Sequence, residues 1–189
     1  MRKLFIFGFA AVLLVLALHS QRATSSGDAP PPSSDVVGRL GASFAMARLY
    51  AQAPDEKLVV PVRGVRVRQI KDTWHAPRSG ERLHQGQDIF APRGTPVQSA
   101  TEGYVVRVGE NNLGGKTVSV LGAGGRIYYY AHLDDYAPGL STGDYVTTET
   151  VLGEVGTTGN AQGTPPHLHF GVYAAGGAIN PLPLLADKS

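Results

Sequence analysis

Between Leu58 and Leu185, the hydrophobic residues fall into short runs that are separated by Gly, Pro and Asn. Short runs of this kind are typical of β-strands, whose successive side chains point to opposite faces of a sheet. We predict strands at 58–61, 65–67, 95–100, 103–108, 117–121, 126–131, 151–155 and 167–173. The segment 58–185 is therefore expected to form one mainly β domain.

Two stretches of this segment repeat one pattern. In the first, Gly94-Thr95-Pro96-Val97 leads to Gly103-Tyr104-Val105; in the second, Gly143-Asp144-Tyr145-Val146 leads to Gly153-Glu154-Val155. A repeat of this length favours a duplicated β-hairpin-like unit over a solenoid array. We expect a compact β-sandwich or small barrel of the duplicated hybrid-motif type.

A helical pattern over residues 35–53 precedes the strands. Asp35 is a suitable N-cap, and Pro54 ends the pattern. Apolar residues recur between them at spacings of three and four, as on an amphipathic helix, namely Val37, Leu40, Phe44, Ala47 and Ala51. Such a short N-terminal helix either covers the open side of the domain or acts as an inhibitory flap, and both alternatives stay open.

The first 34 residues indicate export. Arg2 and Lys3 precede an apolar run over residues 4–18, so 1–19 is interpreted as an export signal. The run is shorter than the roughly 20 residues of a membrane-spanning helix, and no small-x-small cleavage site follows it. A cleaved signal and a short anchor in the inner membrane through residues 4–18 are both left open. Residues 20–34 are rich in Ser and Pro and are expected to be a linker.

The composition limits the kinds of site that this chain can form. The 189 residues include 24 Gly and 13 Pro, which favour turns, and the formal net charge of +2 gives no support to nucleic-acid binding. No cysteine is present, which excludes disulfides, thiolate metal sites and a lipoprotein anchor. Oligomeric state is not indicated. Basic residues crowd one stretch and are interpreted as a solvated face, namely Arg63, Arg66, Arg68, Lys71, Arg78, Arg82 and Arg93.

Two histidine motifs favour a shared metal ion. In His167-Leu168-His169 the imidazoles are two residues apart, so on a strand both point to one face while Leu168 points to the other. From His84 to Asp88 a spacing of four, with a turn at Gly86, brings a nitrogen and a carboxylate together, as zinc prefers.

The donor types indicate catalysis. Three protein ligands plus water are typical of catalytic zinc, whereas structural zinc usually has four Cys-rich ligands. His132 joins the candidate set, while His75 and His19 lack partners in the sequence and are left out. If two imidazoles and a carboxylate bind the ion, two histidines remain to transfer protons. No HExxH and no G-x-S-x-G motif occurs, so the helix-borne zinc protease pattern is absent and serine catalysis is poorly supported.

Several segments of 58–185, in order, resemble the LytM or lysostaphin-type peptidoglycan endopeptidases. The first runs from His84-Gln-Gly-Gln-Asp88 through Ile-Phe-Ala-Pro-Arg-Gly-Thr-Pro-Val97. The others are Tyr130-Ala-His132-Leu133, Gly143-Asp144-Tyr-Val146, Gly156-Thr-Thr-Gly159-Asn160 and Pro166-His167-Leu-His169-Phe170.

The resemblance implies roles for these residues. By position, His84, Asp88 and His169 would bind one Zn²⁺ ion, while His132 and His167 would act on the water and the tetrahedral intermediate. The implied substrate is the peptide stem of peptidoglycan, and the segments 93–96 and 160–166 are most similar to Gram-negative members, which implies a periplasmic enzyme. The bond that is cut stays open between a D-Ala–diaminopimelate link, an L,D link, a glycine bridge and a bond in a protein substrate.

Two other functions compete with the enzyme. A LytM-like protein can bind the wall or activate an amidase without cutting, but such regulators typically lack some of the ligands that are intact in this sequence. A biotinyl or lipoyl carrier also has paired β units, but it requires a modifiable lysine at a hairpin tip and has no use for clustered histidines. The carrier is therefore set well behind.

Overall fold

The computed structural model describes residues 44–78 and 80–188. The predicted signal at 1–19, the linker at 20–34 and the first part of the predicted helix lie outside the described residues. The strands are β1 (Leu58–Val59), β2 (Gln87–Phe90), β3 (Pro96–Gln98), β4 (Gly103–Asn111), β5 (Gly115–Leu121), β6 (Ile127–Tyr136), β7 (Tyr145–Val146), β8 (Val151–Val155), β9 (His167–Ala174), β10 (Gly177–Ile179) and β11 (Leu185–Ala186). Short 3-10 helices are η1 (Val67–Gln69), η2 (Ala123–Gly125), η3 (Gly159–Ala161) and η4 (Leu182–Leu184).

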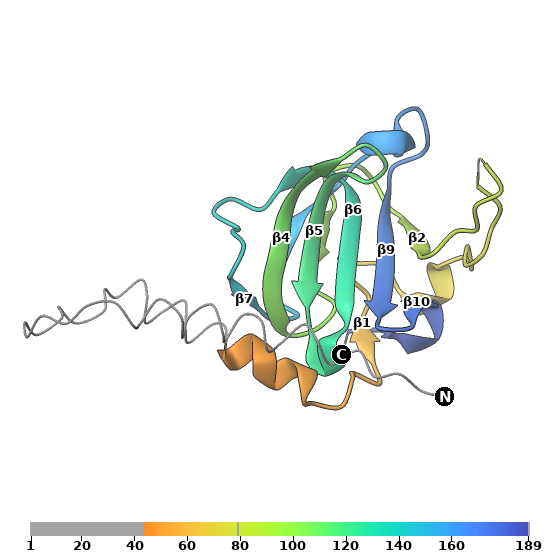
Figure 1. Ribbon diagram of the computed structural model, residues 1–189. Coiled ribbons are helices and arrows are strands. Elements are labelled where there is room, and N and C mark those ends of the chain that lie inside the picture. Colours follow the sequence, from red (N-terminus) through yellow and green to blue (C-terminus); the bar gives the residue numbers. More distant parts are fainter. Residues whose placement is uncertain (1–43, 79, 189) are drawn as a thin grey trace, which may run out of the picture. The chain divides into compact units, whose positions relative to one another are not determined.

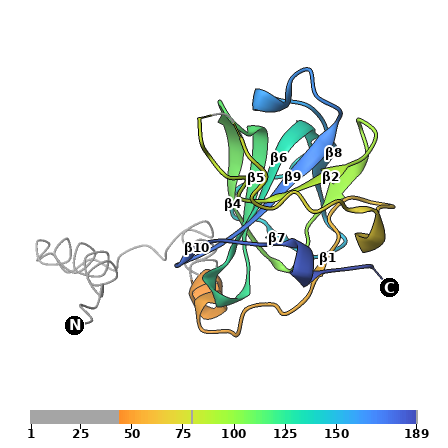
Figure 2. The ribbon, with the colours of Figure 1, turned by 90° about the vertical axis from the view of Figure 1, so that its right-hand side faces the viewer.

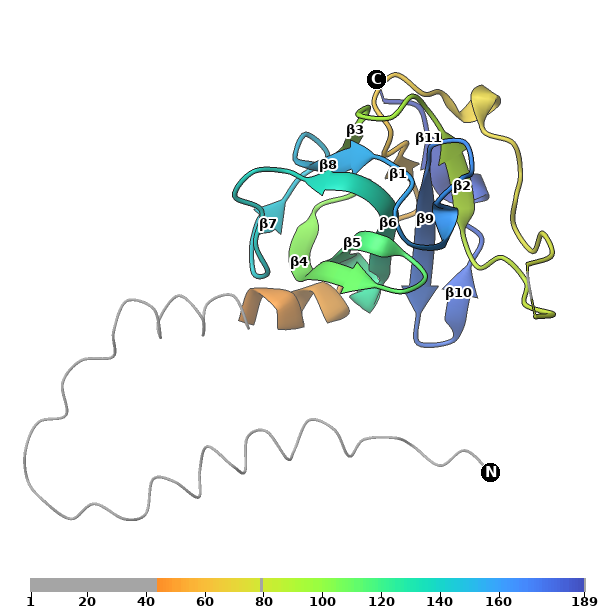
Figure 3. The same cartoon turned by 90° about the horizontal axis from the view of Figure 1, so that it is seen from above.

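Nine strands form one antiparallel sheet in the order β10-β9-β6-β5-β4-β7, with β2 on β9, β8 on β6 and β3 on β8. β4, β5, β6 and β9 lie side by side (Figure 1), and β2 and β10 lie next to β9 in the view from above (Figure 3). Among the described strands this pairing does not close into a ring, so the sheet is open. The expectation of a mainly β domain is confirmed.

A separate two-stranded sheet joins the two ends of the domain. β1 pairs in parallel with β11, so Leu58 lies opposite Leu185, and Figure 2 shows β1 close to the C-terminal segment. Both leucines are buried in the core. Burial of a leucine side chain contributes roughly 1.5–3 kcal/mol, which favours this closure.

The two repeated stretches exchange their strands. β3, from the first copy, pairs with β8 of the second copy, so Val97 is opposite Gly153. In the same way β4 pairs with β7, so Tyr104 is opposite Tyr145. Each copy therefore completes the other, and the expected pairing within each copy as a hairpin is wrong. Each repeated stretch does supply two strands, but the turn residues do not show which strand is the partner.

The core fills the face of the sheet opposite the site. Tyr128, Tyr130, Phe170 and Leu168 are fully buried there with most of the β-strand valines. Alternation along β6 and β9 explains this, because every second side chain of a strand points to the same face. On β9, His167 and His169 flank the buried Leu168 and therefore point to the other face.

Some strand predictions need correction. The segment 65–67 is not a strand, since Val67 begins η1. β2, β7, β10 and β11 were not predicted, because they are short or polar. β2 matters most, because the turn expected at Gly86 leads directly into a strand that carries Asp88.

The helix also differs from expectation. Residues 44–50 are helical, and 51–52 form a turn, so the helix ends before residue 53. Phe44 is 72% exposed and Ala47 is exposed, so the predicted apolar face is not buried at these positions. Tyr50 instead lies against Gly125, where a Cβ atom would come within 2.5 Å of the tyrosine ring.

Candidate metal centre

The pairing of β2 with β9 brings two candidate ligands together. Asp88 lies directly opposite His169, and Phe90 lies opposite His167. Leu168 points into the core and is fully buried, so the histidines on either side of it point to the other face. The expectation that the two imidazoles share a face, with Leu168 packing on the opposite side, is confirmed by this register.

His84 approaches from the loop before β2. Its Nε2 atom lies 2.8 Å from Nδ1 of His169 and 3.1 Å from Oδ1 of Asp88. Gly86 makes the approach feasible, because a Cβ atom at this position would lie 2.5 Å from Cε1 of His169 and 2.9 Å from the carbonyl oxygen of Phe170. The glycine therefore provides space for the His169 ring, in addition to leading the chain into β2.

The three donor atoms have a geometry that could hold a divalent metal ion. The third separation, between Nδ1 of His169 and Oδ1 of Asp88, is 3.2 Å. Donors at about 2.0–2.1 Å from a tetrahedral zinc ion lie roughly 3.3–3.4 Å apart, so small adjustments would admit the ion. His84 and Asp88 are 4% and 6% exposed, and neutral imidazoles with one carboxylate match the preference of zinc.

Outer contacts fix the orientation of these donors. Nδ1 of His84 lies 2.7 Å from the carbonyl oxygen of Thr73, and because a carbonyl can only accept, the ring donates there and presents Nε2 to Asp88 and His169. Burial acts to raise the pKa of Asp88, but the adjacent His169 and His84 rings outweigh it and hold that pKa well below its usual range. The carboxylate is therefore charged and available to a cation.

His132 reaches the site through an irregularity in β6. Lys116 pairs with Leu133 and Val118 pairs with Tyr130, so β6 has one extra residue in this interval, which is a β-bulge. His132 has a φ of 63°, a left-handed conformation that is uncommon outside glycine. The bulge returns Leu133 to the core and turns His132 toward the other histidines, where its ring centroid is 5.0 Å from that of His167.

His132 and His167 both present Nε2 to the centre. Nδ1 of His132 lies 2.9 Å from the carbonyl oxygen of Thr158, and Nδ1 of His167 lies 2.8 Å from that of Pro165. Each ring therefore donates through Nδ1 to a backbone carbonyl oxygen, which turns its Nε2 away from that carbonyl. Burial lowers the pKa of His132 to about 4, so this imidazole is neutral near neutral pH and able to accept a proton.

Sequence reasoning missed several neighbours of the cluster. Arg78, interpreted as part of a solvated face, instead pairs its guanidinium with Oδ2 of the buried Asp88. Tyr129 packs edge-on against His169, and Phe90, which is 51% exposed, packs against His167. Alternation separates Tyr129 from Tyr128 and Tyr130, but no pattern in the sequence marks Arg78. His75 is exposed and stacks on Trp74.

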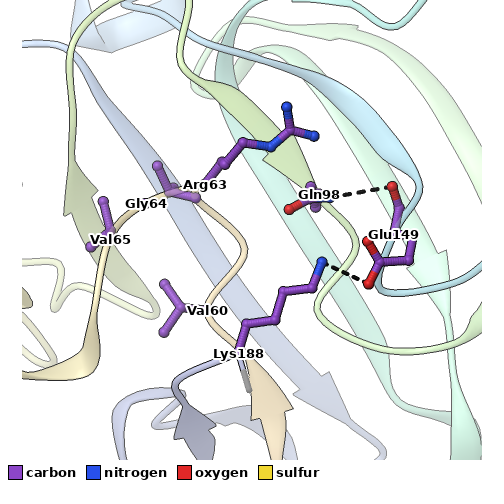
Figure 4. Close-up of a pocket in the computed structure, with 8 residues that line it drawn as sticks. Val60, Arg63, Gly64, Val65, Gln98, Glu149 and Lys188 are labelled. Atoms are coloured by element: carbon purple, nitrogen blue, oxygen red, sulfur yellow. Dashed lines mark hydrogen bonds and ion pairs between the residues drawn. The ribbon is translucent and has the colours of Figure 1, made fainter.

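A cavity of about 360 Å³ lies elsewhere on the domain (Figure 4). Lys188 and Glu149 form an ion pair of 2.8 Å at its edge, and Gln98 donates to the Glu149 carbonyl oxygen. None of the five candidate site residues lines it. The cavity is therefore separate from the histidine cluster.

Curated relatives match the segment that carries this site. An L-Ala–D-Glu endopeptidase of Bacillus subtilis is 40% identical over 114 residues, which are 57% of this chain and 35% of the relative. The peptidoglycan DD-endopeptidase ShyC of Vibrio cholerae is 33% identical over 106 residues, which are 56% of this chain and 24% of the relative. The chain thus spans about a third or less of the length of these relatives.

Solved structures agree with the fold. Csd3 of Helicobacter pylori matches with a TM-score of 0.56 at 32% identity, over 70% of this chain and 35% of that one. A zinc-containing peptidase of Vibrio cholerae matches with a TM-score of 0.55 at 26% identity, over 68% of this chain and 39% of that one. The model of peptidase family M23 matches residues 82–181, more than half of the chain and all five candidate site residues. The chain therefore belongs to peptidase family M23.

Proposed function

We propose that this chain is a zinc-dependent endopeptidase that hydrolyses amide bonds in the cross-linking peptides of peptidoglycan. One observation carries the proposal: the ligand atoms of His84, Asp88 and His169 lie within 4.8 Å of one another. Two further histidines, His132 and His167, stand beside this cluster: the His132 ring lies 5.0 Å from that of His167 and 5.9 Å from that of His169. The names of the relatives, which include a peptidoglycan DD-endopeptidase, support the choice of substrate.

The proposed division of labour follows from the side chains. His84, Asp88 and His169 would hold the zinc ion, which when bound would supply the Lewis acidity that polarises a carbonyl and acidifies water. His132, neutral and buried, takes a proton at Nε2 from the attacking water. His167, on the same face, would donate from Nε2 to the developing oxyanion when both of its ring nitrogens carry a proton, and His132 would return its proton to the leaving amine.

The domain and its location are part of the same proposal. Residues 58–185 would be the peptidase domain, and the export signal at 1–19 would deliver it to the periplasm. In the described part of the chain, no helix combines the length and the apolar character that crossing a membrane requires.

Digestion of purified peptidoglycan tests the proposal. The full-length protein with zinc should release new amino termini, and mass spectrometry of the muropeptides should name the cut bond. A chelator should abolish the release and added zinc should restore it. His84→Ala is the metal-free control and should release none. Stoichiometric zinc without any new amino termini would refute the enzyme and favour the regulator that binds wall or amidase without cutting.

A further inference from the structure

One strap of chain, residues 71–78, contacts both His84 and Asp88. Thr73 accepts two hydrogen bonds: its carbonyl oxygen accepts from Nδ1 of His84 at 2.7 Å, and its hydroxyl accepts from the Asp88 backbone N–H at 2.9 Å. The fully buried Gln87 ties the strap down, because its side chain accepts from the Thr73 N–H and donates to the Lys71 carbonyl oxygen. The strap is therefore fixed to the base of the site.

The same strap delivers Arg78 to the Asp88 carboxylate. A narrow hairpin forms there, in which Pro77 bridges to Leu83 and the Arg78 N–H donates to the Arg82 carbonyl oxygen at 2.8 Å. At this position the Arg78 guanidinium contacts Oδ2 of Asp88. The Arg78 side chain is 40% exposed, whereas that of Asp88 is 7% exposed. The ion pair thus covers one oxygen of a buried carboxylate from the solvent side.

The two carboxylate oxygens of Asp88 consequently face different partners. Oδ1 lies 3.1 Å from Nε2 of His84 and 3.2 Å from Nδ1 of His169, while Oδ2 is occupied by the guanidinium. A free carboxylate can bind a metal ion through one oxygen or through both. Because Arg78 occupies Oδ2, Asp88 could bind the ion through Oδ1 only. A metal position that Oδ2 would otherwise fill then remains for water and substrate.

We propose that Arg78 is a positioning residue that restricts Asp88 to binding the metal through Oδ1 alone. The inference rests on the proposed zinc site. It is distinct from direct substrate binding, in which the exposed part of the guanidinium would pair with a carboxylate of the peptide. It is also distinct from a purely structural role of the hairpin.

Cobalt(II) substitution in the full-length protein tests this role. Four-coordinate cobalt(II) absorbs strongly in the visible range, and a fifth ligand weakens the absorption. Arg78→Ala frees Oδ2, so its cobalt spectrum should be clearly weaker than that of the wild type. Its kcat should fall about 10–100-fold, with KM changed by less than threefold. Arg78→Lys, which keeps a cation that can donate to Oδ2, should restore much of the wild-type spectrum.

Arg63→Ala is the matched control, because this exposed arginine lines the separate cavity in Figure 4 and should leave spectrum and kcat unchanged. Thermal unfolding of each variant monitors the fold. An unchanged cobalt spectrum in a folded Arg78→Ala protein would overturn the proposal. A rise in KM alone would overturn it in favour of substrate binding. Failure of the wild type to bind zinc or cobalt would overturn the metal site itself, which separates the two proposals.

Discussion

Asp88 and His169 are direct partners across the antiparallel pair β2–β9, and Oδ1 of Asp88 lies 3.2 Å from Nδ1 of His169. The register of the sheet therefore sets the distance between two candidate ligands. A slip of one residue would turn every side chain of β2 to the opposite face. The strand pairing is thus part of the site as well as of the fold.

The two histidines of β9 should have separable roles. His169→Ala removes a donor atom from the cluster, so zinc binding and peptidoglycan hydrolysis should both be lost. His167→Ala leaves all three donors in place and should lose activity by at least 100-fold while it retains most of its zinc. Metal analysis after dialysis, with the exposed His75→Ala as control, measures the difference. Equal zinc loss in the two variants would contradict this division of roles.

Gly86 should be required for its small size. In Gly86→Ala the new methyl group would lie 2.5 Å from Cε1 of His169 and 2.9 Å from a backbone oxygen, so the His169 ring must leave its present position beside Asp88. We expect zinc affinity to fall at least tenfold, measured by competition with a chelator. Gly176→Ala is the control, because a Cβ atom there meets nothing within 4 Å. Equal zinc affinity in both variants would show that His169 can tolerate the displacement.

The Thr73 hydroxyl should support Asp88 through the backbone. Thr73→Val keeps the shape of the side chain but removes the acceptor for the Asp88 N–H, which is part-buried. We expect a stability loss of about 1–3 kcal/mol and weaker zinc binding. Thr73→Ser keeps the hydroxyl and should stay close to the wild type in both chemical denaturation and zinc titration. A serine variant as impaired as the valine variant would show that loss of the hydroxyl acceptor does not by itself explain the effect.

Phe90 should contact the substrate. Its ring is half exposed and lies 5.2 Å from the His167 ring, on the face that carries the candidate ligands. Phe90→Ala removes apolar surface beside the proposed reacting group, and kcat/KM should fall about tenfold, which corresponds to about 1.4 kcal/mol of lost contact. Zinc content should not change. Steady-state kinetics on a cross-linked muropeptide provide the measurement, with Phe90→Leu as the intermediate case.

Alkaline pH should destabilise the core through Tyr130. Burial raises the pKa of Tyr130 to about 12, whereas an unfolded tyrosine titrates near about 10. Below pH 10 both states are protonated and the stability is fully present. Between about pH 10 and 12 the unfolded chain releases its proton first, so the free energy of unfolding falls, by up to about 3 kcal/mol from this residue.

Denaturant titrations from pH 9 to 12 measure the slope. Tyr130→Phe should flatten it, although this variant loses some stability at every pH because the Ala100 N–H loses its acceptor, the Tyr130 hydroxyl. The slope, and not the absolute stability, is therefore the diagnostic quantity. The same slope in the wild type and the variant would assign alkaline unfolding to other groups.

Short-range rules predicted much of this domain. Alternation placed Leu168 in the core and the flanking histidines on the other face, because the period of a strand depends on the backbone alone. The same rule separated Tyr129 from Tyr128 and Tyr130. It failed for β2, where Gln87 and Asp88 are polar but buried, because the preceding segment folds back and supplies Lys71 and Arg78 as their partners.

The amino-acid sequence alone determined the mainly β class, the duplicated pattern and the residue types available to a cysteine-free metal site. The tertiary structure decided that the strands of one repeated stretch pair with those of the other. It also decided that a bulge turns His132 toward the cluster and that Arg78 occupies one oxygen of Asp88. The physical reason is the separation along the sequence over which each kind of interaction acts. Backbone geometry repeats over two residues, whereas the β2–β9 register and the Arg78–Asp88 ion pair join residues well beyond that period, which the alternation of a strand does not encode.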